Sequence, residues 1–264
     1  MDTRVFLQTH PVFNLDEAME ALDIDRDRAH RRLRYFVEQG KVRRLGRGVF
    51  ATVPPGSSST SFQPDRYLTL AAFRPDAIFS HHSALELLGA SHSEWHLCTA
   101  YTDKKRAAMN LDNSELRFLR QPSYLVQANQ IHLGVQSVQR INKTLSITGP
   151  ERTLIEGFRA PNLVGGVEEL FESASGFSLL EVPLLCHILE LYKEKMLWAS
   201  VGWFLERYRE TFFIEESDLF AMEAHVPKSP YYLLANQRGG TLLSRWNLIV
   251  PDHLVEQGEA RVYE

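Results

Sequence analysis

Cationic side chains gather in one short stretch of the sequence, at a density that suits binding to a polyanion. From position 26 to 47 the chain holds nine Lys and Arg residues against Asp27 and Glu38, a net charge of +7 in a protein whose overall charge is −4. The cations are Arg26, Arg28, Arg31, Arg32, Arg34, Lys41, Arg43, Arg44 and Arg47. A positive island on an acidic protein is typical of a module that binds phosphates. The alternative is a solvated helix face that happens to be basic.

The periodicity of this stretch favours phosphate binding over a solvated face. Four apolar residues recur at helical spacing and predict one buried stripe, at about 100° per residue: Ala29, Leu33, Phe36 and Val37. Four other residues share a different face, so the helix would present them outward together: Arg28, Arg31, Arg32 and Tyr35. Asp25 is placed to cap the start of this helix, and Gly40 supplies the left-handed residue that ends it.

The segments on either side of the basic helix predict a helix-turn-helix followed by a β-hairpin. Asn14 and Glu17 have the spacing of a capping box that opens a preceding helix, and the break at 23–25 has the length of the turn in a helix-turn-helix. After Gly40, alternating apolar and basic residues and a Gly46-Arg47-Gly48 tip predict a β-hairpin. With a short first helix at 3–9, whose Val5 and Phe6 would join the core, residues 1–53 are predicted to form a winged helix-turn-helix.

In a winged helix-turn-helix, different cations are expected to contact different parts of the DNA. The first half of the second helix would enter the major groove, where Arg donates two hydrogen bonds to guanine. The expected base-reading residues are Arg26, Arg28, Arg31 and Arg32. The expected phosphate contacts are Tyr35, Lys41, Arg43 and Arg44, and Arg47 would reach the minor groove. If about five phosphates are neutralised, the logarithm of the binding constant should fall with that of the salt concentration at a slope of about −4.5.

The remainder of the chain predicts a second, larger domain. Residues 54–64 are rich in Pro and Ser and predict a linker. Residues 65–264 predict a mixed α/β domain with antiparallel strands and packed helices, so the fold class is α+β. The expected strands are 95–101, 116–119, 131–141, 143–148, 231–234 and 246–250. The expected helices include 65–73, one that Ser80 caps, one whose first turn holds Pro150, and several beyond residue 164.

No complete catalytic site is evident in the sequence. His81, His82, His92 and His96 lie close together but lack metal-ligand spacing, and Ser80 and Ser83 have no nucleophile-elbow motif around them. Cys98 and Cys186 are far apart in apolar contexts and predict no disulfide. We therefore expect a protein that is not an enzyme and uses no cofactor or metal. Without a signal peptide or a long apolar run, it is expected to be cytoplasmic and to have no membrane partner.

Three segments in order resemble the AbiE-type (AbiEi) antitoxins. VRRLGRGVFAT resembles that family's wing, through Arg43, Arg44, Leu45, Arg47, Gly48 and Phe50. PDAIFSHHSALELLGA resembles its Ser-x-x-Ser-Ala-Leu helix, through Ser80, Ser83 and Ala84. LSITGPERTLIEGFRAP resembles its strand and Thr-Leu-aliphatic-acidic helix, through Thr153 and Leu154, with Glu156 where the family commonly has Asp. VGWFLER, at residues 201–207, extends the likeness weakly.

This resemblance implies a bacterial type IV toxin–antitoxin, or abortive-infection, system. The winged domain would repress its own operon at inverted repeats in double-stranded DNA. The C-terminal domain would neutralise a nucleotidyltransferase-like toxin without a stable complex. Two alternatives stay open at this point: a stand-alone regulator whose C-terminal domain senses a ligand or partner, and a DNA-tethered enzyme such as a nuclease.

Overall fold

The computed structural model describes residues 1–104 and 106–255 of the chain. It is a mixed α/β structure, 42% helical and 20% strand, which confirms the predicted fold class. The chain divides into two compact units, each of which makes most of its contacts within itself. Unit 1 comprises residues 1–79, 96–120 and 137–146, and unit 2 comprises residues 80–95, 121–136 and 147–264.

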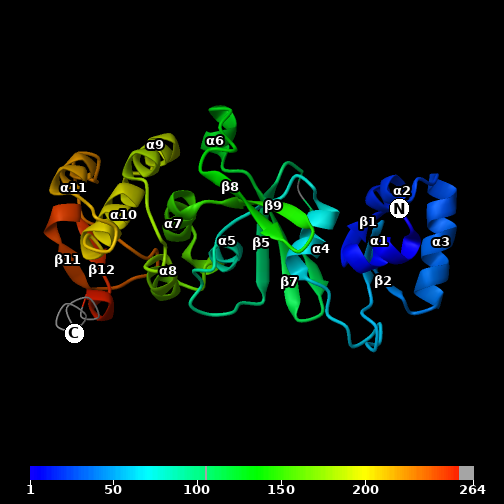
Figure 1. The fold of residues 1–264 in the computed structure, drawn as a ribbon. Coiled ribbons are helices and arrows are strands. Elements are labelled where there is room, and N and C mark those ends of the chain that lie inside the picture. Colours follow the sequence, from blue (N-terminus) through cyan, green and yellow to red (C-terminus); the bar gives the residue numbers. More distant parts are fainter. Residues whose placement is uncertain (105, 256–264) are drawn as a thin grey trace. The chain divides into compact units, whose positions relative to one another are not determined.

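The first part of unit 1 has the element order of a winged helix (Figure 1). The elements are α1 (Thr3–Thr9), β1 (Val12–Asn14), α2 (Leu15–Leu22), α3 (Arg26–Glu38), β2 (Val42–Gly46) and β3 (Val49–Thr52). The three strands pair antiparallel in the order β1-β3-β2. Strand β1 was not predicted from the sequence, and its three residues are extended because they pair with Phe50 and its neighbours in β3.

Local capping interactions set the ends of these helices, as the sequence predicts. The side chain of Asn14 accepts from the Glu17 amide at 2.9 Å, and Glu17 accepts from the Asn14 amide at 2.9 Å. Asp25 accepts from the Arg28 amide at 2.8 Å and starts α3. Gly40 follows α3 with a φ of 65°, the left-handed conformation that glycine adopts at least cost.

The winged helix has a hydrophobic core of its own. Its buried members come from all three helices and from the strands: Phe6, Phe13, Leu15, Ala18, Leu22, Ala29, Leu33, Val42 and Phe50. The prediction that Val5 also joins this core is wrong. Val5 is 45% exposed on α1, whereas Phe6 is buried and packs edge-on against Phe13, and Leu7 is partly buried against the same core.

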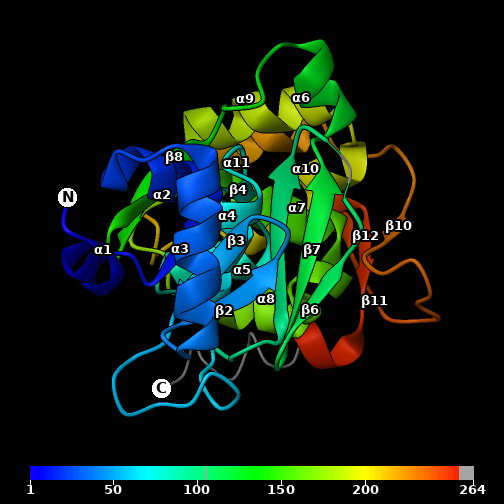
Figure 2. The same ribbon diagram turned by 90° about the vertical axis from the view of Figure 1, so that its right-hand side faces the viewer.

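A six-stranded mixed sheet follows the winged helix, after α4 (Arg66–Phe73). Its strands are β4 (Ile78–Phe79), β5 (Leu97–Thr102), β6 (Met109–Leu111), β7 (Ser114–Arg120), β8 (Val135–Arg140) and β9 (Lys143–Thr148), in the order β6-β7-β5-β4-β9-β8. Figure 2 shows β6 and β7 side by side. The expectation of antiparallel strands fails at β5 and β7, which are parallel. The short strand β6 reverses the chain at the sheet edge, so β7 enters beside β5 in the same direction.

Unit 2 is mainly helical and packs around one apolar core. Its helices are α5 (His82–Leu87), α6 (Ser123–Gln127), α7 (Pro150–Arg159), α8 (Val167–Ala174), α9 (Val182–Tyr192), α10 (Lys195–Arg207) and α11 (Glu216–Glu223), with 3-10 turns at Pro161–Leu163 and Ser244–Trp246. A small sheet orders β10 (Tyr231–Tyr232), β12 (Leu248–Val250) and β11 (Thr241–Leu243) as β10-β12-β11. The predicted start of a helix at Pro150 is confirmed.

The prediction that Ser80 caps α5 is wrong. The helix starts at His82, and His81 occupies the cap position with a φ of 56° and no side-chain cap. Ser80 lies one residue earlier, where its hydroxyl is 2.9 Å from Nδ1 of His81. The hydroxyl is therefore engaged by the imidazole beside it.

The compact units do not coincide with the predicted domains 1–53, 54–64 and 65–264. The winged helix belongs to the same unit as α4 and most of the six-stranded sheet, and ion pairs such as Glu17–Lys143 (2.6 Å) join them. The independence of residues 1–53 therefore stays a prediction. Among the described residues, no helix is both long and apolar enough to cross a bilayer.

Candidate nucleic-acid interface

Helix α3 buries one side and exposes the rest. Ala29 and Leu33 are buried and Phe36 is partly buried against the core of the winged helix. The prediction that Val37 belongs to the buried stripe is wrong, since 37% of this residue is exposed. At about 100° per residue, Val37 lies roughly 40° beyond Leu33 at the edge of the stripe, close to the end of the helix.

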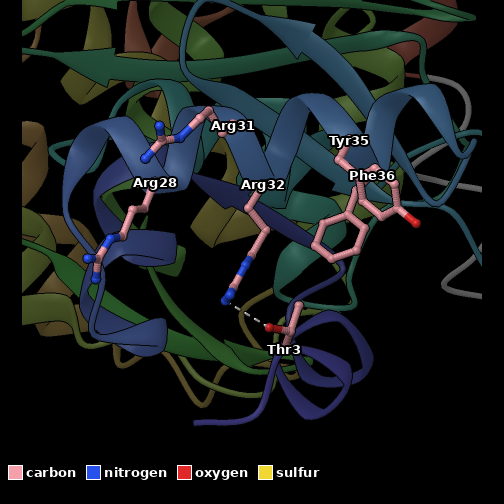
Figure 3. A pocket seen from close by; sticks show the side chains of 6 residues that line it. All are labelled: Thr3, Arg28, Arg31, Arg32, Tyr35 and Phe36. Carbon is pink, nitrogen blue, oxygen red and sulfur yellow. Dashed lines mark hydrogen bonds between the residues drawn. The ribbon is translucent and has the colours of Figure 1, made fainter.

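The opposite side of α3 brings four of the predicted site residues together. Arg28, Arg31, Arg32 and Tyr35 line one shallow hollow, with Thr3 and Phe36 completing its wall (Figure 3). Tyr35 is 54% exposed, so its ring is available to a ligand. An exposed helix face that carries three guanidinium groups and an aromatic ring can bind in the major groove of DNA, where arginines donate hydrogen bonds to base edges.

The three arginines of this face differ in how they are held. Nη1 of Arg32 donates to Oγ1 of Thr3 at 3.1 Å, which orients its side chain toward α1 (Figure 3). Nε of Arg28 lies 3.3 Å from Oδ2 of Asp25, and both side chains are largely exposed. Arg31 makes no hydrogen bond or ion pair with any residue that the structure describes, so its cation is free to meet a phosphate or a base.

Asp25 links the start of the helix to this face electrostatically. The backbone hydrogen bond from Arg28 has the largest effect on the pKa of its carboxyl and lowers it. Desolvation opposes this change, and the charges of Arg28 and Arg31 lower the pKa further. A carboxylate at this position also complements the helix dipole. Asp25 therefore stays ionised at neutral pH and caps α3 without neutralising Arg31.

Arg26 is not brought to this face. It is the first residue of α3 and is exposed, but about 100° per residue places it roughly 160° around the helix from Arg28. A base contact from Arg26 would therefore need a different helix orientation from one that uses Arg28, Arg31 and Arg32.

The β2–β3 hairpin presents the remaining cations. Lys41, Arg44 and Arg47 are exposed, and Arg47 stands at the tip between two glycines, of which Gly48 has a φ of 74°. Nε of Arg44 donates to the Gly46 carbonyl at 3.3 Å, a contact within the same turn. The hairpin therefore has the solvent-exposed basic tip that the sequence predicts.

Arg43 departs from its predicted role as a phosphate contact. Its Nη2 and Nη1 donate to the two carboxylate oxygens of Asp112 at 2.7 and 2.9 Å, and Nη1 also donates to the Phe62 carbonyl at 2.8 Å. The hydrogen bonds to Asp112 raise the pKa of Arg43 further. Arg43 is therefore not part of the candidate interface, because its donors are committed to Phe62 and to Asp112 in the turn between β6 and β7.

The charge of the protein is divided unevenly between its two units. In the sequence, unit 1 carries 19 Lys and Arg against 13 Asp and Glu, a net charge of +6, whereas unit 2 carries 10 against 20, a net charge of −10. Duplex DNA would therefore be attracted by unit 1 and repelled by unit 2.

Among the described residues of unit 2, the histidines and the buried acid do not assemble a second chemical site. His81 is buried and burial lowers its pKa to about 4, while both ring nitrogens of His82 lie within 3.5 Å of Glu86 or Glu169. Within the described residues, no group of three or more His, Cys, Asp or Glu could hold a metal ion. Unit 2 also holds a buried network that was not predicted from the sequence, in which Glu156 accepts from Arg152 at 2.8 Å and from Tyr192 at 2.5 Å. The i, i+4 spacing of Arg152 and Glu156 was its only signal.

Two comparisons with known proteins agree with this geometry. Residues 3–53 match a family model described as a transcriptional regulator, AbiEi antitoxin. The crystal structure of the Rv2827c protein from Mycobacterium tuberculosis has a similar fold, with a TM-score of 0.62, 17% sequence identity, and coverage of 99% of this chain and 93% of that chain. At this identity the likeness concerns the fold. No curated protein matches the sequence.

Proposed function

We propose that the protein is a DNA-binding transcriptional autorepressor, and that it is the antitoxin of a bacterial type IV toxin–antitoxin system. The observation that carries the first part is the single exposed face of α3 with Arg28, Arg31, Arg32 and Tyr35 beside one hollow. The family match over residues 3–53 supports both parts, because that family joins transcription regulation and antitoxin activity in its description.

DNA binding would place α3 in the major groove and the wing beside it. Arg28, Arg31 and Arg32 are the proposed base readers, since their guanidinium groups can donate to guanine N7 and O6. Lys41, Arg44 and Tyr35 would contact phosphates, and Arg47 at the wing tip would enter or straddle the minor groove. A dimer, or two bound copies, would read an inverted repeat in the operator of the protein's own operon.

The antitoxin activity is assigned to the larger C-terminal part of the chain. In this proposal it acts in the cytoplasm, without catalysis, on a nucleotidyltransferase-like toxin and without a stable complex. The strongly acidic charge of unit 2 supports a task other than DNA binding, because phosphates would be repelled from it.

A pair of cellular assays tests the two activities separately. The full chain is co-expressed with the reading frame directly downstream of its gene, and growth is scored beside a reporter driven by the operon's own promoter. Wild type should restore growth and repress the reporter. Replacing Arg31 and Arg32 by Ala should abolish repression and leave growth rescue intact. Loss of both activities by a folded variant would contradict the division of labour. If the downstream reading frame does not inhibit growth when it is expressed alone, the result would favour a stand-alone regulator over an antitoxin.

A further inference from the structure

A cation outside the winged helix is held against two aromatic rings of unit 1. The guanidinium carbon of Arg106 lies 4.3 Å from the ring centroid of Phe73 in α4 and 5.4 Å from that of Phe118 in β7. Both rings are buried, whereas Arg106 is partly exposed. Cation–π contacts of this kind fix the position of an arginine while leaving its N–H donors available to solvent.

Among the residues that the structure describes, no acid neutralises this arginine. Within the described residues Arg106 has no ion pair or hydrogen bond, and the charge that acts on it is another cation, Arg74. Burial and Arg74 both lower the pKa of Arg106, as expected of a positive site that lacks its anion. Arg74 is itself paired with Asp76, and Asp76 also accepts from the backbone amide of Asp103 at 2.8 Å.

Two further cations are exposed on the elements that hold Arg106, the β5–β6 loop and β7. Lys104 is exposed in the loop between β5 and β6, and its carbonyl accepts from Arg74. Arg120 is exposed two residues beyond Phe118 in β7, so it points to the same face of the sheet as the ring that Arg106 covers. We call Lys104, Arg106 and Arg120 the flanking site.

The flanking site is separated from the wing by a single aromatic ring. A Cβ atom at Gly46 in β2 would lie 2.8 Å from Cζ of Phe73, so the wing strand rests directly on the ring that Arg106 stacks against. Met109, at the start of β6, also approaches Gly46, and the Arg43–Asp112 pair fixes the β6–β7 turn to the wing. The wing and the elements that carry the flanking site are therefore packed against one another within unit 1.

We propose that the flanking site binds backbone phosphates of the same DNA duplex, outside the stretch contacted by α3 and the wing. Arg106 makes the central contact and Arg120 a second one. This inference rests on the proposed DNA-binding function and extends the footprint beyond the winged helix. Because phosphates carry no sequence, the flanking site adds affinity and salt dependence equally on every duplex.

The salt dependence of binding to a 30-base-pair duplex of mixed sequence tests this inference on the full chain. Each phosphate contact contributes about −0.9 to the slope of log K against log salt, so the slope should become less steep than that of wild type by about 0.9 in Arg106→Gln and by about 1.8 when Arg120→Gln is added. Arg106→Lys keeps the charge and should keep the wild-type slope. The matched control is Arg117→Gln, since Arg117 is on the opposite face of β7 and is paired with Glu115 at 2.9 Å.

The outcomes separate this inference from the proposed function. A steep wild-type slope that Arg106→Gln and the double variant leave unchanged would overturn the flanking site and leave DNA binding by the winged helix intact. An equal loss of slope in Arg117→Gln would overturn it as well, because the effect would then be general charge reduction. A wild-type slope near zero would overturn the proposed function itself. Thermal unfolding of each variant checks that the differences arise in folded protein.

Discussion

Arg43 and Asp112 form a two-pronged ion pair that joins the wing to the turn between β6 and β7, with nitrogen–oxygen distances of 2.7 and 2.9 Å. Only about a quarter of each side chain is exposed. A residue that the sequence suggests for DNA contact therefore attaches the winged helix to the rest of unit 1. Its neighbour Arg44 points to solvent and keeps the phosphate-binding role.

Neighbouring arginines of the wing should therefore respond differently to substitution. Arg44→Gln should flatten the salt dependence of DNA binding by about 0.9 in the slope of log K against log salt, because it removes one phosphate contact. Arg43→Gln should leave that slope unchanged and instead lower the free energy of unfolding by about 1 kcal/mol, since the lost ion pair is internal. Fluorescence anisotropy and urea unfolding measure the two quantities. Equal flattening by both variants would show that Arg43 leaves Asp112 to bind DNA.

The winged helix should retain DNA binding when it is separated from the rest of the chain. Residues 1–55 contain the whole of its hydrophobic core, from Phe6 to Phe50, so this fragment should fold. Affinity for duplex DNA should be lower than that of the full chain, since contacts with α4 and the sheet no longer support the wing. Complete loss of binding by a fragment with a native helical circular-dichroism spectrum would contradict this independence.

The capping box at the start of α2 should contribute measurably to stability. Asn14→Ala removes the acceptor for the Glu17 amide and should lower the free energy of unfolding by about 1 kcal/mol, whereas Asn14→Asp keeps an equivalent acceptor and should be close to wild type. Glu17 would keep its ion pair with Lys143 in both variants. Equal stability of Asn14→Ala and Asn14→Asp in urea unfolding would argue against the cap.

Burial of His81 should make the protein less stable in weak acid. Its pKa is lowered to about 4, first by burial and further by the charges of Arg152 and Arg159, against the opposing effect of Glu156. The unfolded chain, with an ordinary pKa near 6.5, binds a proton that the folded chain does not. Stability is therefore complete above about pH 6.5 and falls as the pH drops toward 4, by about 3 kcal/mol in all.

Comparison with His81→Asn isolates this effect, because Asn tolerates positive φ but does not titrate. Urea unfolding at pH 7 and pH 5 should give a smaller loss of stability in the variant than in wild type. If wild type and variant lose the same amount of stability, other groups account for the acid sensitivity.

Short-range signals allowed most of the winged helix to be predicted from sequence. Asn14, Asp25 and Gly40 act within three or four residues of themselves, so their roles at helix ends are readable without a structure. The three-residue strand β1 was missed because its conformation depends on β3, which lies far ahead in the chain. The parallel pairing of β5 and β7 was missed for a related reason, since the edge strand β6 that causes it has only three residues.

The candidate site was predicted in part, for the same physical reason. Helical periodicity is local, so the common face of Arg28, Arg31 and Arg32 followed from spacing, and Arg26 could have been excluded by the same angle. The ion pair of Arg43 could not be predicted, because its partner Asp112 is 69 residues away in a turn for which the sequence gives no local signal. Arg106 was missed because it belongs to no basic helix and gains its position from Phe73 and Phe118.

The salt dependence of duplex binding by the full chain tests most directly the claim that the exposed face of α3 binds DNA. The test variant is Arg31→Ala/Arg32→Ala. The control is Arg34→Ala, which lies on the same helix but away from the hollow. We expect a wild-type slope of about −4.5 or steeper, a large loss of affinity in the double variant, and near-normal binding by Arg34→Ala. A slope near zero, or a double variant that binds as tightly as wild type, would contradict it.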